Sequence, residues 1–248
     1  MRISDWSSDV CSSDLDMKTN EFEQVIGEAV PGVTPGGLPT AASIERRYTR
    51  LEKLNESHKE ALYAVYGPDT PAQMWTYLAG SSVANEVEWD NLFERLLRDS
   101  SKFYYVILDK NTQKALGTFA LMRLDTANRV VEIGSVTYLP ELQRTRMATE
   151  AQYLMARYVF EEMGYRRYEW KCDALNEPWK RAAKRLGFTY EGRFRQAVVY
   201  KGRTRDTDWY SMIDQEWPKR KERFEKWLLP ENFNEEGVQY HSLSQQSL

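Results

Sequence analysis

The sequence predicts an α/β domain in which helices flank a central sheet. Short runs of β-branched and apolar residues, such as Val130 to Leu139, alternate along the chain with longer segments whose apolar residues recur at helical spacing. Turns rich in Gly, Pro, Asn and Asp separate the two kinds of segment, and no internal repeat is visible. With 248 residues, 42% of them hydrophobic and 13% aromatic, the chain can bury a substantial core.

Two stretches precede this pattern. Residues 1–16 are rich in Ser and Asp and lack the basic start and hydrophobic centre of a secretory signal. They resemble the peptide obtained when sequencing-adapter DNA is translated, so Met17 is the expected natural start, and a genuine unstructured tail is the alternative. Residues 17–45 contain a Pro/Gly-rich run and are expected to form an extended segment that wraps the domain or stays mobile.

The domain is expected to occupy residues 46–217 and to begin with a strand from Tyr48 to Leu54. Ser57 is the expected N-cap of the next helix, because Glu60 stands at the capping-box position. The elements expected after it are a short apolar helix from Met74 to Leu78, an amphipathic helix from Glu86 to Arg98, and a strand pair at Phe103 to Asp109 and Ala115 to Leu124.

The segment from Val130 to Phe160 is the centre of the pattern. Its strand stops at Pro140, which has no N–H to donate to a neighbouring strand. A helix with one apolar face follows from Met147. The turn between them carries Arg144 and Arg146. Unpaired amides at a helix N-terminus, the positive end of its dipole and two guanidinium groups favour a phosphate or pyrophosphate there.

The second half of the domain is expected to hold a strand, a helix and two closing strands. These are predicted at Tyr168 to Asp173, Asn176 to Leu186, Phe188 to Phe194 and Asp208 to Ile213. Residues 218–248 complete a charged helix that spans Gln215 to Leu228 and then form a polar tail, which is expected to fray from Asn232 onward.

In this region the sequence resembles the GNAT acyltransferases, and within them the RimJ/RimL-like N-acetyltransferases. The coenzyme-A loop of the family reads Gln/Arg-x-x-Gly-x-Gly/Ala, and Gln143-x-x-Arg146-x-Ala148 stands in its place with Arg for one glycine. Four more features of the branch recur in order, and together they cover about Tyr48 to Trp217. They are Glu132-Ile133-Gly134, Asp173-Ala174-Leu175-Asn176, Leu186-Gly187-Phe188-Thr189-Tyr190-Glu191-Gly192, and Asp206 or Asp208 before a closing strand.

The resemblance implies a single domain with a mixed, splayed sheet that binds acetyl-CoA between two central strands and transfers the acetyl group to an amine. Acceptor pockets of the family are shaped by the helices that correspond to Met74 to Arg98. The implied coenzyme-binding residues are Val136, Thr137, Tyr138, Gln143, Arg144, Thr145, Arg146, Met147, Ala148, Thr149, Asn176 and Trp179.

Two residues are the candidates at the reacting centre. By strand alternation Glu132 shares a face with Gly134, Val136 and Tyr138, so a single carboxylate on an apolar surface is placed to take the acceptor's proton, directly or through water. The alternative is a glutamate paired with an arginine. The amide of Asn176 can serve the pantetheine arm, or it is a plain helix N-cap.

The family pattern departs at two positions that concern the general acid. Trp179 stands where RimL-like members often have a serine near the thiol, and Ala183 stands where other GNAT enzymes have an acidic tyrosine. No obvious general acid remains. A GNAT-like module that binds an acyl-CoA and acts as an interaction scaffold without catalysis is therefore the alternative to an enzyme.

Composition excludes several other classes. The net charge of −3 gives no overall bias toward nucleic acid or anionic membranes, and no apolar run approaches the ~20 residues of a membrane span. Two cysteines and two histidines offer neither a metal site nor a disulfide framework. We expect a cytoplasmic protein, monomeric or homodimeric. The basic run from Lys180 to Arg205 is a solvated face, or it attracts coenzyme phosphate, an acidic acceptor or RNA.

Overall fold

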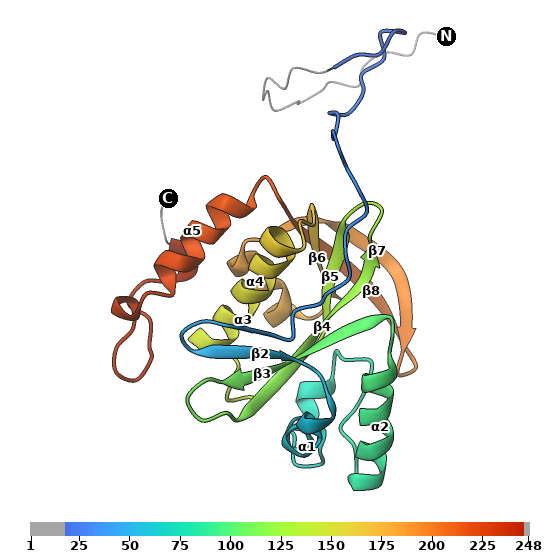
Figure 1. Ribbon diagram of the computed structural model, residues 1–248. Coiled ribbons are helices and arrows are strands. Elements are labelled where there is room, and N and C mark those ends of the chain that lie inside the picture. The colour runs from blue at the N-terminus through green and yellow to red at the C-terminus, as the bar shows by residue number, and fades with distance from the viewer. Residues whose placement is uncertain (1–17, 246–248) are drawn as a thin grey trace. The chain divides into compact units, whose positions relative to one another are not determined.

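Eight strands form one sheet in the order β1-β2-β3-β4-β5-β6-β8-β7 (Figure 1). The computed structural model describes residues 18–245. The strands are β1 (Ser43–Glu45), β2 (Thr49–Lys53), β3 (Lys102–Asp109), β4 (Ala115–Asp125), β5 (Val130–Tyr138), β6 (Arg167–Asp173), β7 (Thr189–Tyr200) and β8 (Arg203–Ile213). Strands β5 and β6 are parallel and all other neighbours are antiparallel, which confirms the predicted mixed α/β sheet.

Five α-helices accompany the sheet. They are α1 (Lys59–Tyr66), α2 (Glu86–Arg98), α3 (Arg146–Arg157), α4 (Glu177–Leu186) and α5 (Trp217–Trp227). Helix α3 continues into a π-helical turn, η3 (Tyr158–Glu162), and the short 3-10 helices are η1 (Glu56–His58), η2 (Ala72–Trp75), η4 (Pro230–Asn232) and η5 (Leu243–Gln245).

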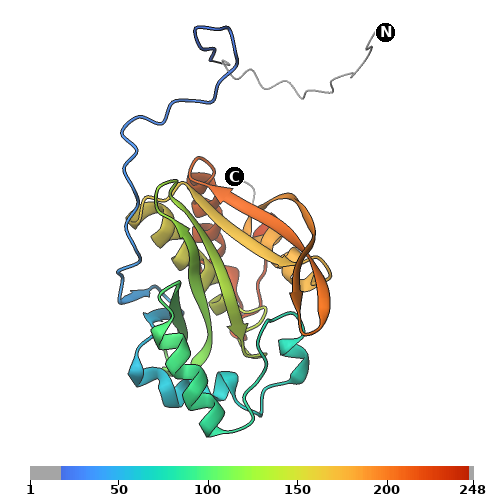
Figure 2. The same cartoon turned by 90° about the vertical axis from the view of Figure 1, so that its right-hand side faces the viewer.

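The helices cover opposite faces of the sheet and bury two separate cores (Figure 2). Strand β3 shows the division, because its successive side chains point to opposite faces. Tyr105 and Ile107 belong to the large core under α3, α4 and α5, whereas Val106 and Leu108 belong to the smaller core under α1 and α2. We call these the α3 face and the α1 face of the sheet.

Two local expectations in the first half of the domain are wrong. The cap of the first helical turn is Asn55, whose side chain accepts from the Ser57 amide at 2.9 Å, so the helical segment starts two residues before the expected cap. The helix expected from Met74 to Leu78 is the single 3-10 turn η2. A short apolar run fits both conformations equally well, and sequence spacing alone does not separate them.

The C-terminal tail is packed rather than frayed, so the expectation for the chain beyond Asn232 is also wrong. The Asn232 side-chain amide donates to the carbonyls of Trp227 and His241, at 3.0 and 3.1 Å, and its oxygen accepts from the His241 amide. Leu243 is fully buried in the core of the α3 face. One buried Leu and one bonded Asn hold a tail whose composition is otherwise polar.

The described N-terminal residues are divided between two units of the chain. Residues 18–34 make a unit of their own with an isolated bridge between Thr19 and Val25, and the predicted artefact at residues 1–16 lies outside the described residues. Residues 35–42 belong to the domain. The hydroxyl of Tyr158 accepts from the amides of Thr40 and Ala41 at 2.8 and 3.0 Å, which ties this segment to the end of α3.

Candidate active site

Strands β5 and β6 separate part-way along their length. They pair from Val130 with Arg167 as far as Ile133 with Trp170, and beyond this point residues 134–138 and 171–173 no longer pair with each other. A β-bulge accompanies the separation and bends β5. The backbone groups that face the gap are therefore available to a bound molecule.

The bulge centres on Ser135, whose φ is +49°, and it shifts the β4–β5 register by one residue. Beyond the shift, the even-numbered side chains of β5 point to the opposite face of the sheet from those before it. Val136 and Tyr138 join the core of the α3 face, while Glu132 lies on the α1 face. The expectation that these side chains share one face is wrong, because strand alternation holds only where no extra residue is inserted.

The turn after β5 is held by its own side chains. Gln143 Nε2 donates to the carbonyl of Tyr138 at 3.2 Å. Thr145 is the N-cap of α3: its hydroxyl accepts from the Ala148 amide at 3.1 Å and donates to the Leu142 carbonyl at 2.7 Å. The loop is thus fixed by contacts within a few residues of sequence.

Three backbone amides of this loop indicate an anion-binding site. In the part of the chain that the structure describes, the amides of Arg144, Arg146 and Met147 have no hydrogen-bond partner. Arg144 has a φ of +63°, and successive amides around such a left-handed residue form a concave anion-binding nest. With the positive end of the α3 dipole, these amides suit a phosphate or pyrophosphate.

The side chain of Arg146 is directed to the C-terminal tail. Its guanidinium lies 4.3 Å from the ring centre of Tyr48 and 5.5 Å from that of Phe233, with Gly237 alongside. The family's glycine is therefore replaced by a residue whose side chain packs on aromatic rings, while its amide remains in the loop.

The first turns of α3 are anchored to β2 and α4. The buried carboxylate of Glu150 accepts from the amides of Tyr48 and Thr49 at 2.6 and 2.8 Å, and from that of Arg47 at 3.3 Å. The Thr149 hydroxyl accepts from Arg185 Nη1 at 3.0 Å. These contacts fix the helix N-terminus in place.

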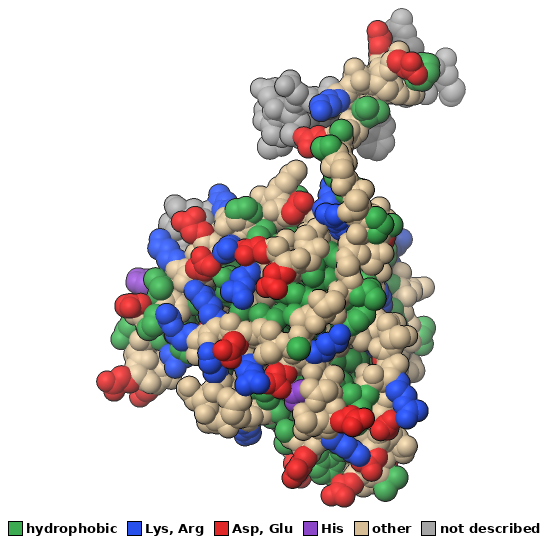
Figure 3. Space-filling view, viewed as in Figure 1, with side chains coloured by type: hydrophobic (Ala, Val, Ile, Leu, Met, Phe, Trp, Pro, Cys, Tyr) green, Lys and Arg blue, Asp and Glu red, His purple; other side chains and the backbone are tan. Residues whose placement is uncertain are grey.

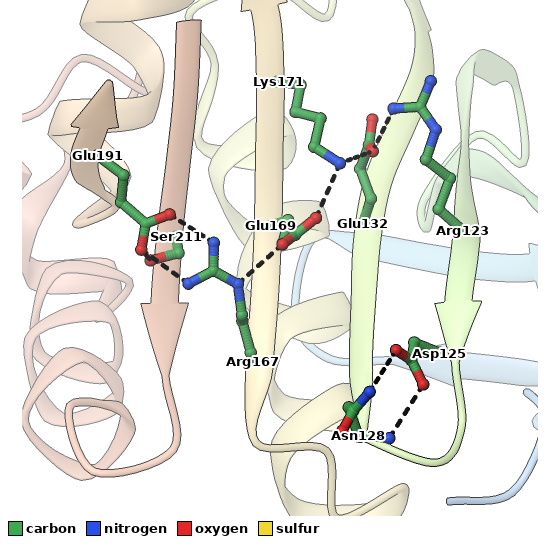
Figure 4. A network of polar contacts seen from close by, with 9 residues as sticks. All are labelled: Arg123, Asp125, Asn128, Glu132, Arg167, Glu169, Lys171, Glu191 and Ser211. Carbon is green, nitrogen blue, oxygen red and sulfur yellow. Dashed lines mark hydrogen bonds and ion pairs between the residues drawn. The ribbon is translucent and has the colours of Figure 1, made fainter. Parts of the chain in front are cut away.

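On the α1 face, charged side chains form a row across β4, β5, β6, β8 and β7 (Figure 4). Glu132 Oε2 accepts from both Arg123 Nη1 and Lys171 Nζ at 2.8 Å. Lys171 Nζ is also 2.8 Å from Glu169 Oε2 and 3.7 Å from the ring centre of Trp209. The Lys171 side chain is only 5% exposed, so its ammonium is enclosed by two carboxylates and an indole.

Glu132 is ion-paired, as the alternative drawn from the sequence expected, but only through one of its two oxygens. The residue is 4% exposed, and its second oxygen, Oε1, has no hydrogen-bond partner among residues 18–245. Oε1 lies on the side of Gly134, 3.3 Å from the position that a Cβ would take there, where β5 leaves β6. One oxygen is held by two cations and the other lies toward Gly134, the first residue of β5 beyond its pairing with β6.

The row ends in a second carboxylate cluster. Arg167 bridges Glu169 Oε1 and Glu191, and Ser211 donates to Glu191 at 2.6 Å. Hydrogen bonds from Arg167 hold the pKa of Glu191 below its usual value. Positive and negative groups alternate along the whole row, so each charge is balanced by its neighbours.

The α3 face of the gap is aromatic. The Trp179 ring lies 4.9 Å from that of Trp170 and 6.1 Å from that of Tyr138, measured between ring centres. Asn176 accepts from the Trp179 amide at 3.3 Å, so it is a helix N-cap, and its Nδ2 has no partner in the described chain. Burial raises the pKa of Cys172 to about 12, which makes this thiol unreactive.

The distal end of the gap is closed by contacts between distant segments. Lys201 Nζ donates to the Trp75 carbonyl at 2.7 Å and Arg203 Nη2 to the Thr76 carbonyl at 3.1 Å. The Tyr77 hydroxyl donates to the Leu175 carbonyl at 3.2 Å. The segment after α1 therefore reaches both the tip of the β7–β8 hairpin and the turn after β6.

Sequence reasoning missed Lys171 and Arg123 as partners of Glu132. A signal for Lys171 existed, because Glu169, Lys171 and Asp173 alternate along one predicted strand and so share its face. The contact between Lys171 and Glu132 cannot be predicted without knowing that β5 and β6 are neighbours in the sheet. In the basic run from Lys180 to Arg205, Lys180 and Arg193 form ion pairs, with Glu177 and Asp208. Figure 3 shows basic and acidic side chains interspersed over the face that carries α5.

A family model described as an acetyltransferase (GNAT) domain matches residues 49–189. The protein belongs to the GNAT acetyltransferase family. A solved GCN5-related N-acetyltransferase from Brucella melitensis is 41% identical, covers 87% of this chain and 98% of its own, and superimposes with a TM-score of 0.84. These two findings support an acyltransferase with the GNAT fold.

Two Bacillus subtilis (strain 168) proteins are also similar to this GNAT chain. The uncharacterized N-acetyltransferase YoaA is 24% identical over 66% of this chain and 92% of its own length. YdaF, whose name carries a provisional assignment as a ribosomal N-acetyltransferase, is 31% identical over 41% of this chain and 55% of its own.

Within residues 18–245, no group of three or more His, Cys, Asp or Glu side chains is arranged to hold a metal ion. None of the helices in that range is long and apolar enough to cross a membrane.

Proposed function

We propose that this protein is an N-acetyltransferase that transfers the acetyl group of acetyl-CoA to a primary amine on a protein N-terminus or a small molecule. The observation that carries the proposal is the separation of β5 and β6 after Ile133 and Trp170, beside the unbonded amides at the start of α3. A gap between strands next to an anion-binding helix terminus suits a long cosubstrate with a diphosphate.

The residues at the gap fit coenzyme A. The free backbone of Val136, Thr137 and Tyr138 is placed to bond the pantetheine arm, and Asn176 Nδ2 offers one more donor. Within the loop from Gln143 to Thr149, the amides of Arg144, Arg146 and Met147 are free for the pyrophosphate, and the Arg144 guanidinium has no partner among the described residues. When bound, acetyl-CoA supplies the acetyl thioester; no metal is needed for this chemistry.

Glu132 is the proposed general base. Arg123 and Lys171 hold Oε2, so the carboxylate has a fixed orientation and keeps Oε1 toward the gap. An amine that arrives as an ammonium ion can lose its proton to Oε1 and then attack the thioester carbon. All three Lys171 protons face the two carboxylates and the Trp209 ring, so Lys171 positions Glu132 and does not act as the acid.

The finer assignment is to the RimJ/RimL-like branch. The ordered motifs around Glu132, Gln143 and Asn176 support it, and the name of the relative YdaF is consistent with a ribosomal acceptor. We extend the proposal to a cytoplasmic protein that is monomeric or homodimeric.

The first test measures acetyl-CoA binding. Thermal shift with acetyl-CoA well above a micromolar Kd should stabilise the protein by roughly 1 to 3 kcal/mol. An amine screen that detects released thiol then tests turnover. No stabilisation would overturn the cosubstrate assignment.

A second candidate function is an acyl-CoA-binding module without catalysis. Trp179 in place of the family's serine, and a Glu132 already held by two cations, favour it. Binding of acetyl-CoA with no thiol release for any amine class would select it over the enzyme.

A further inference from the structure

We propose that the outer half of β8 binds the acceptor and that this acceptor is a small amine carrying a carboxylate at the other end of its chain. The inference rests on the proposed acetyl transfer and adds the substrate class. It starts from polar groups that the proposed reaction leaves without a role.

Four buried polar atoms on β8 have no hydrogen-bond partner in the described residues. Tyr210 Oη lies on the α3 face, and the other three are Arg205 Nε, Thr207 Oγ1 and Trp209 Nε1. Buried polar groups in proteins are nearly always bonded, so three on one strand indicate a missing partner. Thr207 is only 5% exposed. The three residues alternate along β8 and therefore lie on one face of the strand.

That face is the α1 face, which carries Glu132. Trp209 pairs with Lys171 in the β6–β8 register and its ring contacts the Lys171 ammonium, which itself contacts Glu132. Thr207 pairs with Asp173, where β6 has left β5. The unpartnered groups therefore lie two strands from Glu132, beside the part of the sheet where β5 and β6 no longer pair.

The neighbouring strand β7 leaves room beside these groups. Its register with β8 shifts between Phe194 and Val198, and Gln196 has a φ of +49°. Phe194 to Ala197 line a hollow at this bulge. The Phe194 ring lies 4.7 Å from that of Trp209 and the residue is 56% exposed, so the hollow opens to solvent and offers an aromatic wall.

The chemistry of the unpartnered atoms selects the ligand. The indole N–H and the arginine Nε–H can only donate, and the threonine hydroxyl can donate or accept. A ligand must therefore bring oxygen acceptors, and a carboxylate brings two. A polyamine brings only donors at neutral pH and would leave the three groups unpaired, which a site of this kind rejects strongly.

The spacing selects the position of the carboxylate. Two strand spacings correspond to about 10 Å between the backbones of β5 and β8 where the strands are paired. Thr207, level with Asp173, also lies further along the sheet than Glu132, which is level with Glu169. This separation suits an amine and a carboxylate at opposite ends of a short chain better than both on one carbon. In the reaction the amine nitrogen forms a bond to the acetyl carbon, the carbon–sulfur bond breaks, Glu132 takes one amine proton, and the thiolate is protonated from water.

The test compares ε-aminocaproate, hexylamine and spermidine as acceptors by thiol release. The unmodified protein should show a kcat/KM for ε-aminocaproate at least tenfold above that for hexylamine, which differs only by lacking the carboxylate. Thr207→Val, which removes the hydroxyl and keeps the shape, should cut this ratio several-fold through KM. Thr204→Val, at an exposed position of the same strand, should leave the ratio unchanged.

The ratio is measured within each variant, so a partly unfolded sample does not change it. Equal kcat/KM values for ε-aminocaproate and hexylamine, or a preference for spermidine, would overturn the inference about the acceptor. Acetylation of hexylamine would still support the proposed function, so the two failures can be told apart. A preference for a peptide N-terminus with a blocked carboxyl end would also overturn it. If no amine is acetylated, calorimetry of ε-aminocaproate with CoA present decides: binding weakened by Thr207→Val supports the site, and absence of binding refutes it.

Discussion

The coenzyme side and the acceptor side of the gap are built differently. The coenzyme side uses one continuous run, in which Gln143 bonds Tyr138 and Thr145 bonds Ala148. The acceptor side joins side chains from strands far apart in sequence, as Glu132 does with Lys171. In the function proposed above, backbone amides recognise a constant cosubstrate in the first case and side chains meet a variable acceptor in the second. Substitutions on the acceptor side should therefore change specificity without loss of coenzyme binding.

The largest expected effect concerns Glu150. Unlike the contacts of Gln143 and Thr145 within the loop, its hydrogen bonds reach residues far away in the sequence. Its buried carboxylate accepts from the amides of Arg47, Tyr48 and Thr49, which lead into β2. Glu150→Ala leaves them unpaired and should lower the free energy of unfolding by about 4 kcal/mol in urea denaturation. Glu141→Ala removes a half-exposed carboxylate next to the same loop and should change it by less than about 1 kcal/mol. Equal effects would show that the loop needs no anchor to β2.

Glu132→Gln tests the separation of proton transfer from coenzyme binding. The amide keeps the shape but cannot take a proton, so kcat should fall about 10²-fold or more, while the Kd for acetyl-CoA stays nearly unchanged. The loss should be greatest at low pH, because hydroxide can substitute as the pH rises. Glu191→Gln, at the far end of the same row, is the control. Full activity would mean that Glu132 only pairs with Arg123 and Lys171, and an unfolded variant would assign it a structural role.

The arginines of the loop should affect binding before chemistry. Arg144→Ala and Arg146→Ala together should weaken acetyl-CoA binding by roughly 1 to 3 kcal/mol in calorimetry, with kcat preserved. Arg144 should account for most of this loss, because the Arg146 guanidinium lies over Tyr48 and Phe233. An equal contribution from Arg146 would require its side chain to leave the rings when the coenzyme binds.

The smallest expected effect is on Cys172, at the aromatic side of the gap. Burial raises its pKa to about 12, so near pH 8 only about one thiol in 10⁴ is ionised, and the thiolate fraction grows only as the pH rises toward that value. A Cys11→Ser variant, which leaves Cys172 as its single thiol, should show almost no reaction with a disulfide reagent until denaturant is added. Rapid labelling of the folded protein would mean that solvent enters the gap from the α3 face.

Sequence alone predicts the elements around the β5–α3 loop well for a physical reason. The strand ending before Pro140, the cap and the helix start are set by residues within one short segment, and the structure places both ends of β5 and the start of α3 within one residue of their expected positions. The acceptor side was missed for the opposite reason. The bulge at Ser135 depends on how β4 and β5 pair, and the Glu132–Lys171 contact depends on strand order.

The hairpin and the tail show a second limit. Strand β7 continues to Tyr200, six residues beyond its expected end, because its pairing with β8 sustains a strand whose side chains are mostly exposed. Exposed edge residues carry little alternation for a sequence pattern to detect. The tail is held by Asn232 and Leu243, single residues whose partners lie elsewhere in the fold.

The position of Leu243 in the core has a consequence for biosynthesis. A chain emerging from the ribosome presents its N-terminal residues first, and domains fold as their parts become available. Here the core of the α3 face includes Leu243, and Arg146 in the coenzyme loop rests on Phe233. A nascent chain halted before Phe233 would therefore carry the entire sheet and still lack the support of the proposed coenzyme loop, so coenzyme binding should be acquired only after Phe233 has been synthesised.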